Sequence, residues 1–168
     1  LTAVTLLLED FMEAWKGKLG LYGFAGGRST WEIAAALKGI AQHASVWGKD
    51  QSAFIVSADI ARAFDNVTLT TLARAMEKLC IPTRLQYALL EPLSVTSCTI
   101  VFEGIEMPGI PWDKSLRTGG TESPLAFNLV VIAMWSEVVE ELDTRRIGYD
   151  IPNPLEPCSY HHYNHAIW

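Results

Sequence analysis

Two aspartates, Asp59 and Asp65, are the side chains in this sequence whose type and position best suit chemistry. They follow an apolar run at residues 53–58, in which β-branched Ile55 and Val56 favour a short strand buried on at least one face. A carboxylate at the end of a buried strand is unfavourable unless it is paired, and a bound cation is a common partner. The spacing is equally explained if both aspartates cap the helix that follows, because Asp is a favoured N-cap residue.

A second polar segment, YGFAGGRST at residues 22–30, is rich in glycine and precedes a predicted helix. Glycines followed by Ser29 and Thr30 at a helix start can form a nest of backbone N–H groups that binds an anion. The same residues fit a plain loop in which Ser29 or Thr30 is the N-cap. The segment does not match a phosphate-binding P-loop, because Tyr22 replaces the first glycine and Arg28 replaces the lysine.

A third segment, RTGGTESPLAFN at residues 117–128, combines a basic residue, two glycines and a strong helix start. Ser123 followed by Pro124 predicts an N-cap and the first helical position, and the helix continues to about Leu142. The Ser-Pro pair does not account for the residues immediately upstream, Arg117 to Gly120. Glycines at those positions allow another backbone or a ligand to approach closely.

Taken in their order along the chain, the three segments resemble motifs of reverse transcriptases, especially those of non-LTR retrotransposons and group II introns. Residues 59–67, DIARAFDNV, resemble the first palm motif, and residues 23–30 resemble the G-F-x-x-G-R-S-T element between the fingers and that motif. The second palm motif of the family is written R-Q-G-x-x-x-S-P-x-L-F-N. The residues that match it are Arg117, Gly119, Ser123, Pro124, Phe127 and Asn128.

The resemblance implies roles for residues of the first motif. Asp59 would bind the catalytic magnesium ions, and the backbone carbonyl of Ile60 would be a second ligand. The backbone N–H groups after Arg62, beginning at Ala63, would face the triphosphate. The ring of Phe64 would lie under the sugar of the incoming nucleotide as the steric gate that disfavours a 2′-hydroxyl.

The resemblance also implies contacts with nucleic acid and nucleotide outside the first motif. Gly119 would let the template-side nucleotide come close to the backbone. Arg28 and Arg117 would contact the nucleic-acid backbone, where the fork of guanidinium donors suits phosphate. The chain departs from the family at Thr118, which replaces a glutamine near the incoming nucleotide, and at Thr121-Glu122, which replaces a more apolar pair.

Asp65 is expected to be structural, either capping or pairing, and Ser123-Pro124 to anchor the supporting helix.

Catalysis in the family uses two magnesium ions about 4 Å apart, which activate the primer 3′-hydroxyl and steady the triphosphate and leaving pyrophosphate. Holding the pair requires carboxylates from at least two strand ends, because Mg²⁺ prefers oxygen ligands. The implied partners are an RNA template, a DNA primer and deoxynucleoside triphosphates.

Hydrophobic spacing and turn signals predict an α+β fold. Helices are expected at residues 1–16, 30–46, 68–80 and from Pro82 to just before Pro92, and a hairpin at residues 95–110 that turns at Glu103-Gly104. Asp65 or Asn66 is expected to cap the helix at 68–80. The resemblance assigns these elements to a partial right-hand polymerase palm, an antiparallel sheet backed by helices, with part of the fingers.

The whole chain, residues 1–168, is interpreted as a single partial reverse transcriptase domain. Residues 1–50 are the fingers-side helices and glycine-rich loop, and residues 51–168 are the palm with a fingers-side hairpin near 95–110. In the tail, Pro152, Pro154 and Pro157 mark an extended loop. The strand predicted at 163–168 would lead into the third palm motif, which carries two more carboxylates in the family. The fragment alone is therefore expected to be inactive.

Composition limits the other function classes. The net charge of −6 counts against a simple nucleic-acid-binding module, for which a basic surface is expected. The hydrophobic content of 49% is enough for one domain with a sizeable core. Three widely spaced cysteines argue against a disulfide framework or zinc cluster and suit a reducing, intracellular compartment, the nucleus or cytoplasm. No segment is long and apolar enough to span a bilayer, so no membrane partner is expected. His161, His162 and His165 lack nearby cysteine or carboxylate partners for a structural zinc site.

Two alternatives to a polymerase fragment stay open at this point. One is a decayed or domesticated palm that acts as a nucleic-acid-binding or scaffold module, which Thr118 and the acidic balance favour. The other is an unrelated α+β domain, such as a hydrolase that uses Asp59 with a histidine from the tail. The second has little positive support, because the sequence contains neither a G-x-S-x-G elbow nor an H-E-x-x-H helix.

Overall fold

The computed structural model describes residues 2–16, 19–24, 26–46, 54–94, 97–111, 116, 119–152 and 160–164. The chain divides into two compact units. The first contains Leu1–Glu13 and Ile60–Met134, and the second contains Ala14–Asp59 and Trp135–Trp168.

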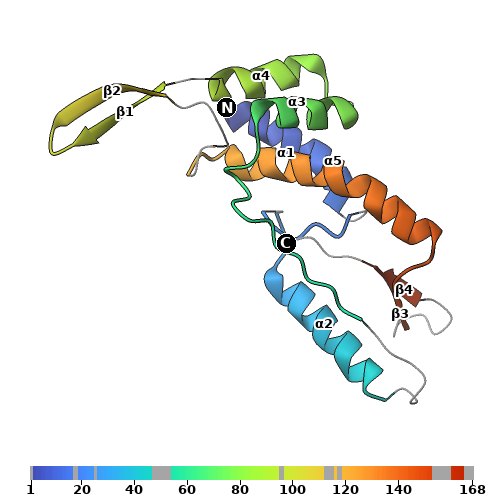
Figure 1. Ribbon diagram of the computed structural model, residues 1–168. Coiled ribbons are helices and arrows are strands. Elements are labelled where there is room, and N and C mark those ends of the chain that lie inside the picture. The colour runs from blue at the N-terminus through green and yellow to red at the C-terminus, as the bar shows by residue number, and fades with distance from the viewer. Residues whose placement is uncertain are drawn as a thin grey trace. The chain divides into compact units, whose positions relative to one another are not determined.

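The fold class is α+β, as the sequence predicts: helices are combined with two antiparallel, two-stranded sheets. None of the helices within the described ranges has the length and apolarity that a membrane span requires. In chain order the elements labelled in Figure 1 are α1 (Thr2–Lys16), α2 (Thr30–Ala44), α3 (Leu69–Lys78), α4 (Thr83–Leu93), β1 (Ser97–Phe102), β2 (Ile105–Pro111), α5 (Ser123–Thr144), β3 (Tyr149–Pro152) and β4 (Tyr160–Tyr163).

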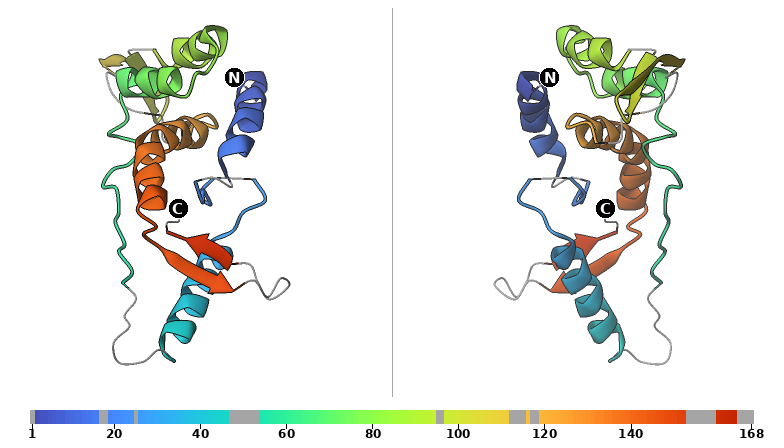
Figure 2. Two further views of the ribbon diagram at one scale, coloured as in Figure 1. Left: turned by 90° about the vertical axis from the view of Figure 1, so that its right-hand side faces the viewer. Right: turned by 90° about the vertical axis from the view of Figure 1, so that its left-hand side faces the viewer.

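In the first unit, α3 and α4 lie side by side as a helical hairpin (Figures 1 and 2). α3 is amphipathic, since Leu72 and Met76, one turn apart, are fully buried while its other face is exposed. Leu89 of α4 is also fully buried, as are Leu129 and Ile132 in the first half of α5. These aliphatic side chains make up much of the core of this unit.

The end of α4 differs from the prediction. The helix continues through Pro92 to Leu93, whereas the sequence predicts that it ends before the proline. Proline lacks the N–H that would bond four residues back, but the backbone N–H of Ser94 still donates to the carbonyl of Leu90 at 2.9 Å. The last turn therefore tolerates the proline.

The hairpin predicted near residues 95–110 is confirmed as β1 and β2, which pair antiparallel. Its turn is Glu103-Gly104, and both residues have left-handed φ angles, 50° and 78°, as a two-residue hairpin loop requires. The pairing register shifts between Cys98 and Ile100. Figure 1 shows the hairpin extending away from the helices of its unit, and most of its large apolar side chains are exposed.

The second unit contains a β3–β4 hairpin, whereas the sequence predicts an extended loop around Pro152 and a strand only from Tyr163 onward. β3 and β4 pair antiparallel, with Tyr149 opposite Tyr163, and the hairpin lies beside α2 in Figure 2. His43 of α2 joins them: its Nδ1 hydrogen-bonds to the hydroxyl of Tyr149, and the ring centroids are 6.0 Å apart.

Only part of the predicted tail can be compared with the structure. Of the strand predicted at 163–168, Tyr163 is the last residue of β4, Asn164 is in neither helix nor strand, and residues 165–168 lie outside the described ranges. Pro152 ends β3, whereas Pro154 and Pro157 also lie outside them.

Candidate functional site

The segment that leads to Asp59 is not a buried strand, which corrects the prediction. Residues 54–60 form neither helix nor strand, and Phe54 and Val56 are 89% and 91% exposed. β-Branched residues favour an extended chain, but a strand also needs a neighbour to pair its backbone groups. The strands that the structure describes pair only as β1–β2 and β3–β4. Asp59 is therefore an exposed carboxylate on an irregular segment.

Beyond Asp59, the first motif continues as a series of turns held by local hydrogen bonds. The backbone N–H of Asn66 donates to the carbonyl of Arg62 at 3.0 Å, and its side-chain amide donates to the carbonyl of Ala61 at 2.8 Å. Arg62 has a left-handed φ of 51°. Ala63 and Phe64 lie inside these turns and are half-buried.

Neither Asp65 nor Asn66 caps α3, contrary to the prediction. The N-cap is Thr68, whose hydroxyl accepts a hydrogen bond from the N–H of Thr71 at 3.1 Å. The helix begins later than the Asp-Asn pair, and the side chain of Asn66 is already engaged inside the preceding turn. Asp65 is exposed, so the capping role assigned to it is wrong.

Within the first unit, the structure brings the first and second motifs together at Phe64. The ring of Phe64 lies against the ring of Phe127 in α5, with centroids 5.2 Å apart and planes inclined at 44°. The carbonyl of Phe64 accepts hydrogen bonds from the N–H groups of Leu116 and Val67, each at 3.3 Å. Leu116 is fully buried. Both the backbone and the ring of Phe64 are thus held by the second motif and the segment just before it.

The start of α5 is largely buried, but Pro124 is half-buried, and Ser123 is the first helical residue and not the N-cap that the sequence predicts. Ser123 is 2% exposed and Glu122 is 4% exposed. The helix begins at Ser123 itself, one residue earlier than Pro124, and the N–H of Ala126 donates to the carbonyl of Glu122 at 2.9 Å. Arg117 and Thr118, predicted to contact template and nucleotide, lie outside the described residues.

Glycine suits the two positions before α5 for different structural reasons. Gly119 has a left-handed φ of 89°, a conformation that side chains disfavour. At Gly120 a Cβ would lie 2.8 Å from Oε1 of Glu122 and 2.9 Å from Oγ of Ser123. The close approach at Gly120 is therefore made by the first residues of α5 itself.

We expect Gly120→Ala to lower the free energy of unfolding by about 1–3 kcal/mol, because the added methyl overpacks a buried helix start. Gly39 is the matched control: it lies inside α2, and a Cβ there meets nothing within 4 Å. Gly39→Ala should raise the same free energy by about 0.5–1 kcal/mol. Urea denaturation of the two variants measures both, and effects of the same sign would contradict the packing at Gly120.

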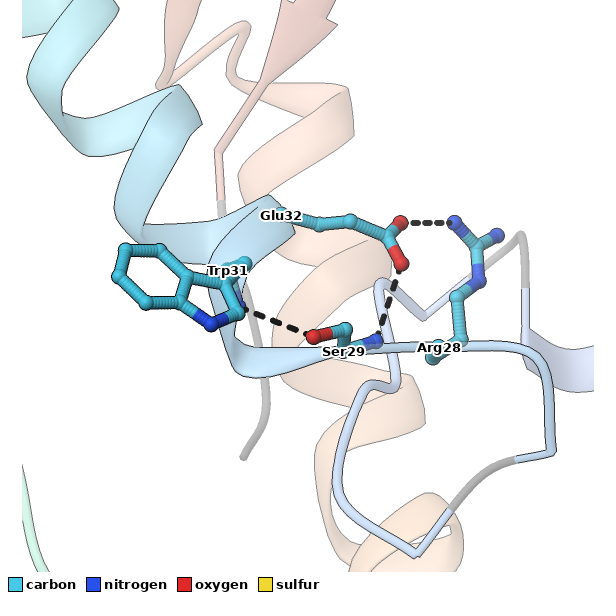
Figure 3. Close-up of polar contacts among 4 residues, drawn as sticks. All are labelled: Arg28, Ser29, Trp31 and Glu32. Atoms are coloured by element: carbon cyan, nitrogen blue, oxygen red, sulfur yellow. Dashed lines mark hydrogen bonds and ion pairs between the residues drawn. The ribbon is translucent and has the colours of Figure 1, made fainter.

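The glycine-rich segment ends in a capping box at the start of α2 (Figure 3). The hydroxyl of Ser29 accepts a hydrogen bond from the N–H of Trp31 at 3.3 Å, and Oε1 of Glu32 accepts one from the N–H of Ser29 at 2.9 Å. Oε2 of Glu32 accepts from Nη1 of Arg28 at 3.2 Å, and the guanidinium carbon of Arg28 lies 5.3 Å from the centre of the Tyr22 ring.

These contacts confirm Ser29 as the N-cap and give Arg28 two partners inside the protein. Arg28 is still partly exposed, with 35% of its side-chain surface accessible. Glu32 is not among the site residues predicted from the sequence, although S-x-x-E at residues 29–32 is the sequence signature of a capping box.

Ser29→Ala should destabilise α2 by about 1 kcal/mol, because the N–H of Trp31 loses its acceptor. Glu32→Gln is the matched control. It keeps an acceptor for the N–H of Ser29 and removes only an exposed ion pair, which contributes about 0.3–0.5 kcal/mol. Hydrogen exchange of the amides in the first turn of α2 measures the difference. Faster exchange in Glu32→Gln than in Ser29→Ala would contradict the assignment of Ser29 as the principal cap.

Comparison with known families decides what these motifs belong to. The family model described as reverse transcriptase (RNA-dependent DNA polymerase) matches residues 2–158, a range that includes all three motifs. The chain belongs to the reverse transcriptase family. No solved structure matches it significantly. The α+β arrangement of this reverse transcriptase domain is consistent with part of a polymerase palm.

Membership of the reverse transcriptase family implies RNA-directed DNA polymerase activity, with template, primer and deoxynucleotides as substrates, and enzymes of this family generally use Mg²⁺. The exposed carboxylate of Asp59 and the carbonyl of Ile60 are oxygen donors of the kind that Mg²⁺ prefers. Among the residues that the structure describes, no three His, Cys, Asp or Glu side chains are grouped to hold a metal. His165 and the side chains of His161 and His162 lie outside them. The donor types fit magnesium, and these two groups alone would supply only part of its coordination.

Proposed function

We propose that this chain is polymerase sequence from a retroelement of the non-LTR retrotransposon or group II intron type. The observation that carries the proposal is the contact between Phe64 and Phe127, because it joins the first motif to the second. A nucleotide-binding surface in this family needs both motifs side by side. The family match over residues 2–158 supports the polymerase assignment at the level of the reverse transcriptase family.

In this proposal each residue of the first motif has a separate task. The carboxylate of Asp59 and the carbonyl of Ile60 are metal ligands, and the N–H groups after Arg62, starting at Ala63, bind the triphosphate. Phe64 excludes a 2′-hydroxyl from the sugar position. Bound Mg²⁺ supplies charge neutralisation and an activated primer hydroxyl.

The second motif and the glycine-rich segment handle the template strand. Gly119 allows the template-side nucleotide to approach, and Thr118 takes the place of the family glutamine that lies near the incoming nucleotide. Arg28 and Arg117 contact phosphates, and a guanidinium can form two hydrogen bonds to one phosphate. Ser123-Pro124 holds the supporting helix, whose buried start supports this role.

We extend the same proposal to domain organisation and cellular location. Residues 1–50 are the fingers side and residues 51–168 the palm side of one partial domain, located in the nucleus or cytoplasm. These 168 residues by themselves should not extend a primer, because the paired carboxylates of the third palm motif do not occur in them. Primer extension is therefore expected only of a complete polymerase polypeptide that contains this sequence together with the third palm motif.

Primer extension by that complete polypeptide tests the proposal. With Mg²⁺, deoxynucleotides and a DNA primer annealed to an RNA template, we expect extension that stops when the template ends. Products of the same length on an unrelated template, or no product on any template, would contradict it. In the second case, unchanged template–primer binding would favour the alternative, a decayed or domesticated palm that binds nucleic acid without catalysis. The substitution at Thr118 is what supports that alternative.

Arg28 has a test of its own, since its ion pair with Glu32 competes with phosphate. Arg28→Gln should weaken template–primer binding and make the slope of log K against log salt shallower by about one unit. Glu32→Gln frees the guanidinium and should leave that slope unchanged or make it steeper. Equal slopes for wild type and Arg28→Gln would mean that Arg28 serves only the start of α2.

A further inference from the structure

We propose that Phe127 is a positioning residue for sugar selection, which holds the ring of Phe64 in the orientation that excludes a 2′-hydroxyl. The inference rests on the proposed function, in which Phe64 is the steric gate. Phe127 needs no contact with the nucleotide in this scheme. It acts through the ring of Phe64.

The backbone of Phe64 is held in place by hydrogen bonds. Its carbonyl accepts hydrogen bonds from Leu116 and Val67 at 3.3 Å each, and Leu116 is fully buried. The remaining freedom is rotation of the side chain about its two torsion angles. A steric gate selects by fractions of an ångström, so a gate that rotated freely would discriminate poorly.

The ring of Phe127 limits this rotation. The two ring centroids are 5.2 Å apart at an inclination of 44°, within the range at which aromatic rings attract one another. Both residues are half-buried, so each ring keeps some accessible surface while contacting the other. A ligand can therefore meet Phe64 without displacing Phe127.

The position of Phe127 is set by the helix that carries it. Phe127 lies in the second turn of α5, and its neighbours Ala126 and Asn128 are buried, at 0% and 3% exposure. The helix backbone fixes the direction of its side chain. We therefore infer that Phe127 acts as the packing surface against which the ring of Phe64 is positioned.

The central experiment compares kcat/KM for ribonucleotide and deoxynucleotide incorporation by the complete polymerase. Phe127→Leu keeps an apolar side chain but removes the ring. It should raise the ribonucleotide-to-deoxynucleotide ratio roughly two- to tenfold, the range that one ring–ring contact can supply. Most of the change should appear in KM for the ribonucleotide. Phe127→Tyr restores a ring and should return the ratio to near the wild-type value.

Val130→Ala is the matched control, because Val130 is half-buried on the same helix but is not in either motif. Its ratio should be unchanged. A purely structural role for Phe127 would instead reduce both incorporation rates equally, leave the ratio constant and resemble a general loss of stability. That result would overturn the inference.

Phe64→Ala separates failure of the inference from failure of the proposed gate. A raised ratio in Phe64→Ala with a normal ratio in Phe127→Leu would show that the gate exists without help from Phe127. Normal ratios in both variants would remove the gate and the inference with it. The chain itself gives a second readout: Phe64→Leu, Phe127→Leu and the double variant should shift the denaturation midpoint non-additively. Additive shifts would contradict coupling between the rings.

Discussion

Asp59→Ala should reduce primer extension by the complete polymerase about a thousandfold or more. Removing a carboxylate ligand weakens the metal that stabilises the developing charge, a contribution of several kcal/mol, and each 1.36 kcal/mol is a factor of ten in rate. Single-turnover extension on an RNA template measures the loss. Because Asp59 is exposed and lies outside helices and strands, its replacement should leave the denaturation midpoint unchanged, which separates a catalytic effect from unfolding.

Asp65→Ala is the control for charge and sequence position. Asp65 is also exposed, six residues further along, and it does not cap α3, since Thr68 does. We expect extension within about twofold of wild type, as for a surface substitution. Loss of activity equal to that of Asp59→Ala would mean that the motif contributes net charge rather than one specific ligand.

Phe64→Ala should raise ribonucleotide incorporation relative to deoxynucleotide incorporation, by roughly tenfold or more. A pocket that discriminates one small group by shape supplies about 10- to 200-fold selectivity, and truncation to alanine opens the space for the 2′-hydroxyl. Competitive incorporation from a mixture of the two nucleotides gives the ratio directly. Phe102→Ala is the control, because that ring is 64% exposed on the β1–β2 hairpin; a shift there as large as at Phe64 would remove the assignment.

Features set by nearby residues could be predicted from the sequence. The apolar spacing that buries Leu72 and Met76 identifies α3, and the Glu103-Gly104 turn identifies the β1–β2 hairpin. Ser29 and the Ser123-Pro124 pair mark the starts of α2 and α5 within one residue. Each of these depends on interactions within about one turn of helix or one hairpin loop, which residue type and spacing describe well.

Features that depend on a distant partner could not be predicted in this way. Ile55 and Val56 have strand propensity, but the structure describes no strand that pairs with them. Residue type also did not separate Asp65 from Thr68 as the cap of α3, because both are good N-cap residues and the choice depends on where the preceding turns end.

The candidate site divides along the same line. The family motifs named Phe64 and Phe127 individually, but their ring contact joins two segments far apart in the sequence. The capping box at Glu32 and its ion pair with Arg28, four residues earlier, are local contacts by contrast, and the S-x-x-E signature of the capping box was visible in the sequence.

Metal-directed cleavage tests the central claim most directly, because it reports where the ion lies without requiring turnover. Fe²⁺ replaces Mg²⁺ at oxygen-rich sites and, with ascorbate and peroxide, generates hydroxyl radicals that cut the nearby backbone. In the complete polymerase bound to template and primer, we expect a cut close to Asp59 that excess Mg²⁺ suppresses and that Asp59→Ala abolishes. Absence of a cut there, or a cut that persists in Asp59→Ala, would contradict the assignment of Asp59 as a metal ligand.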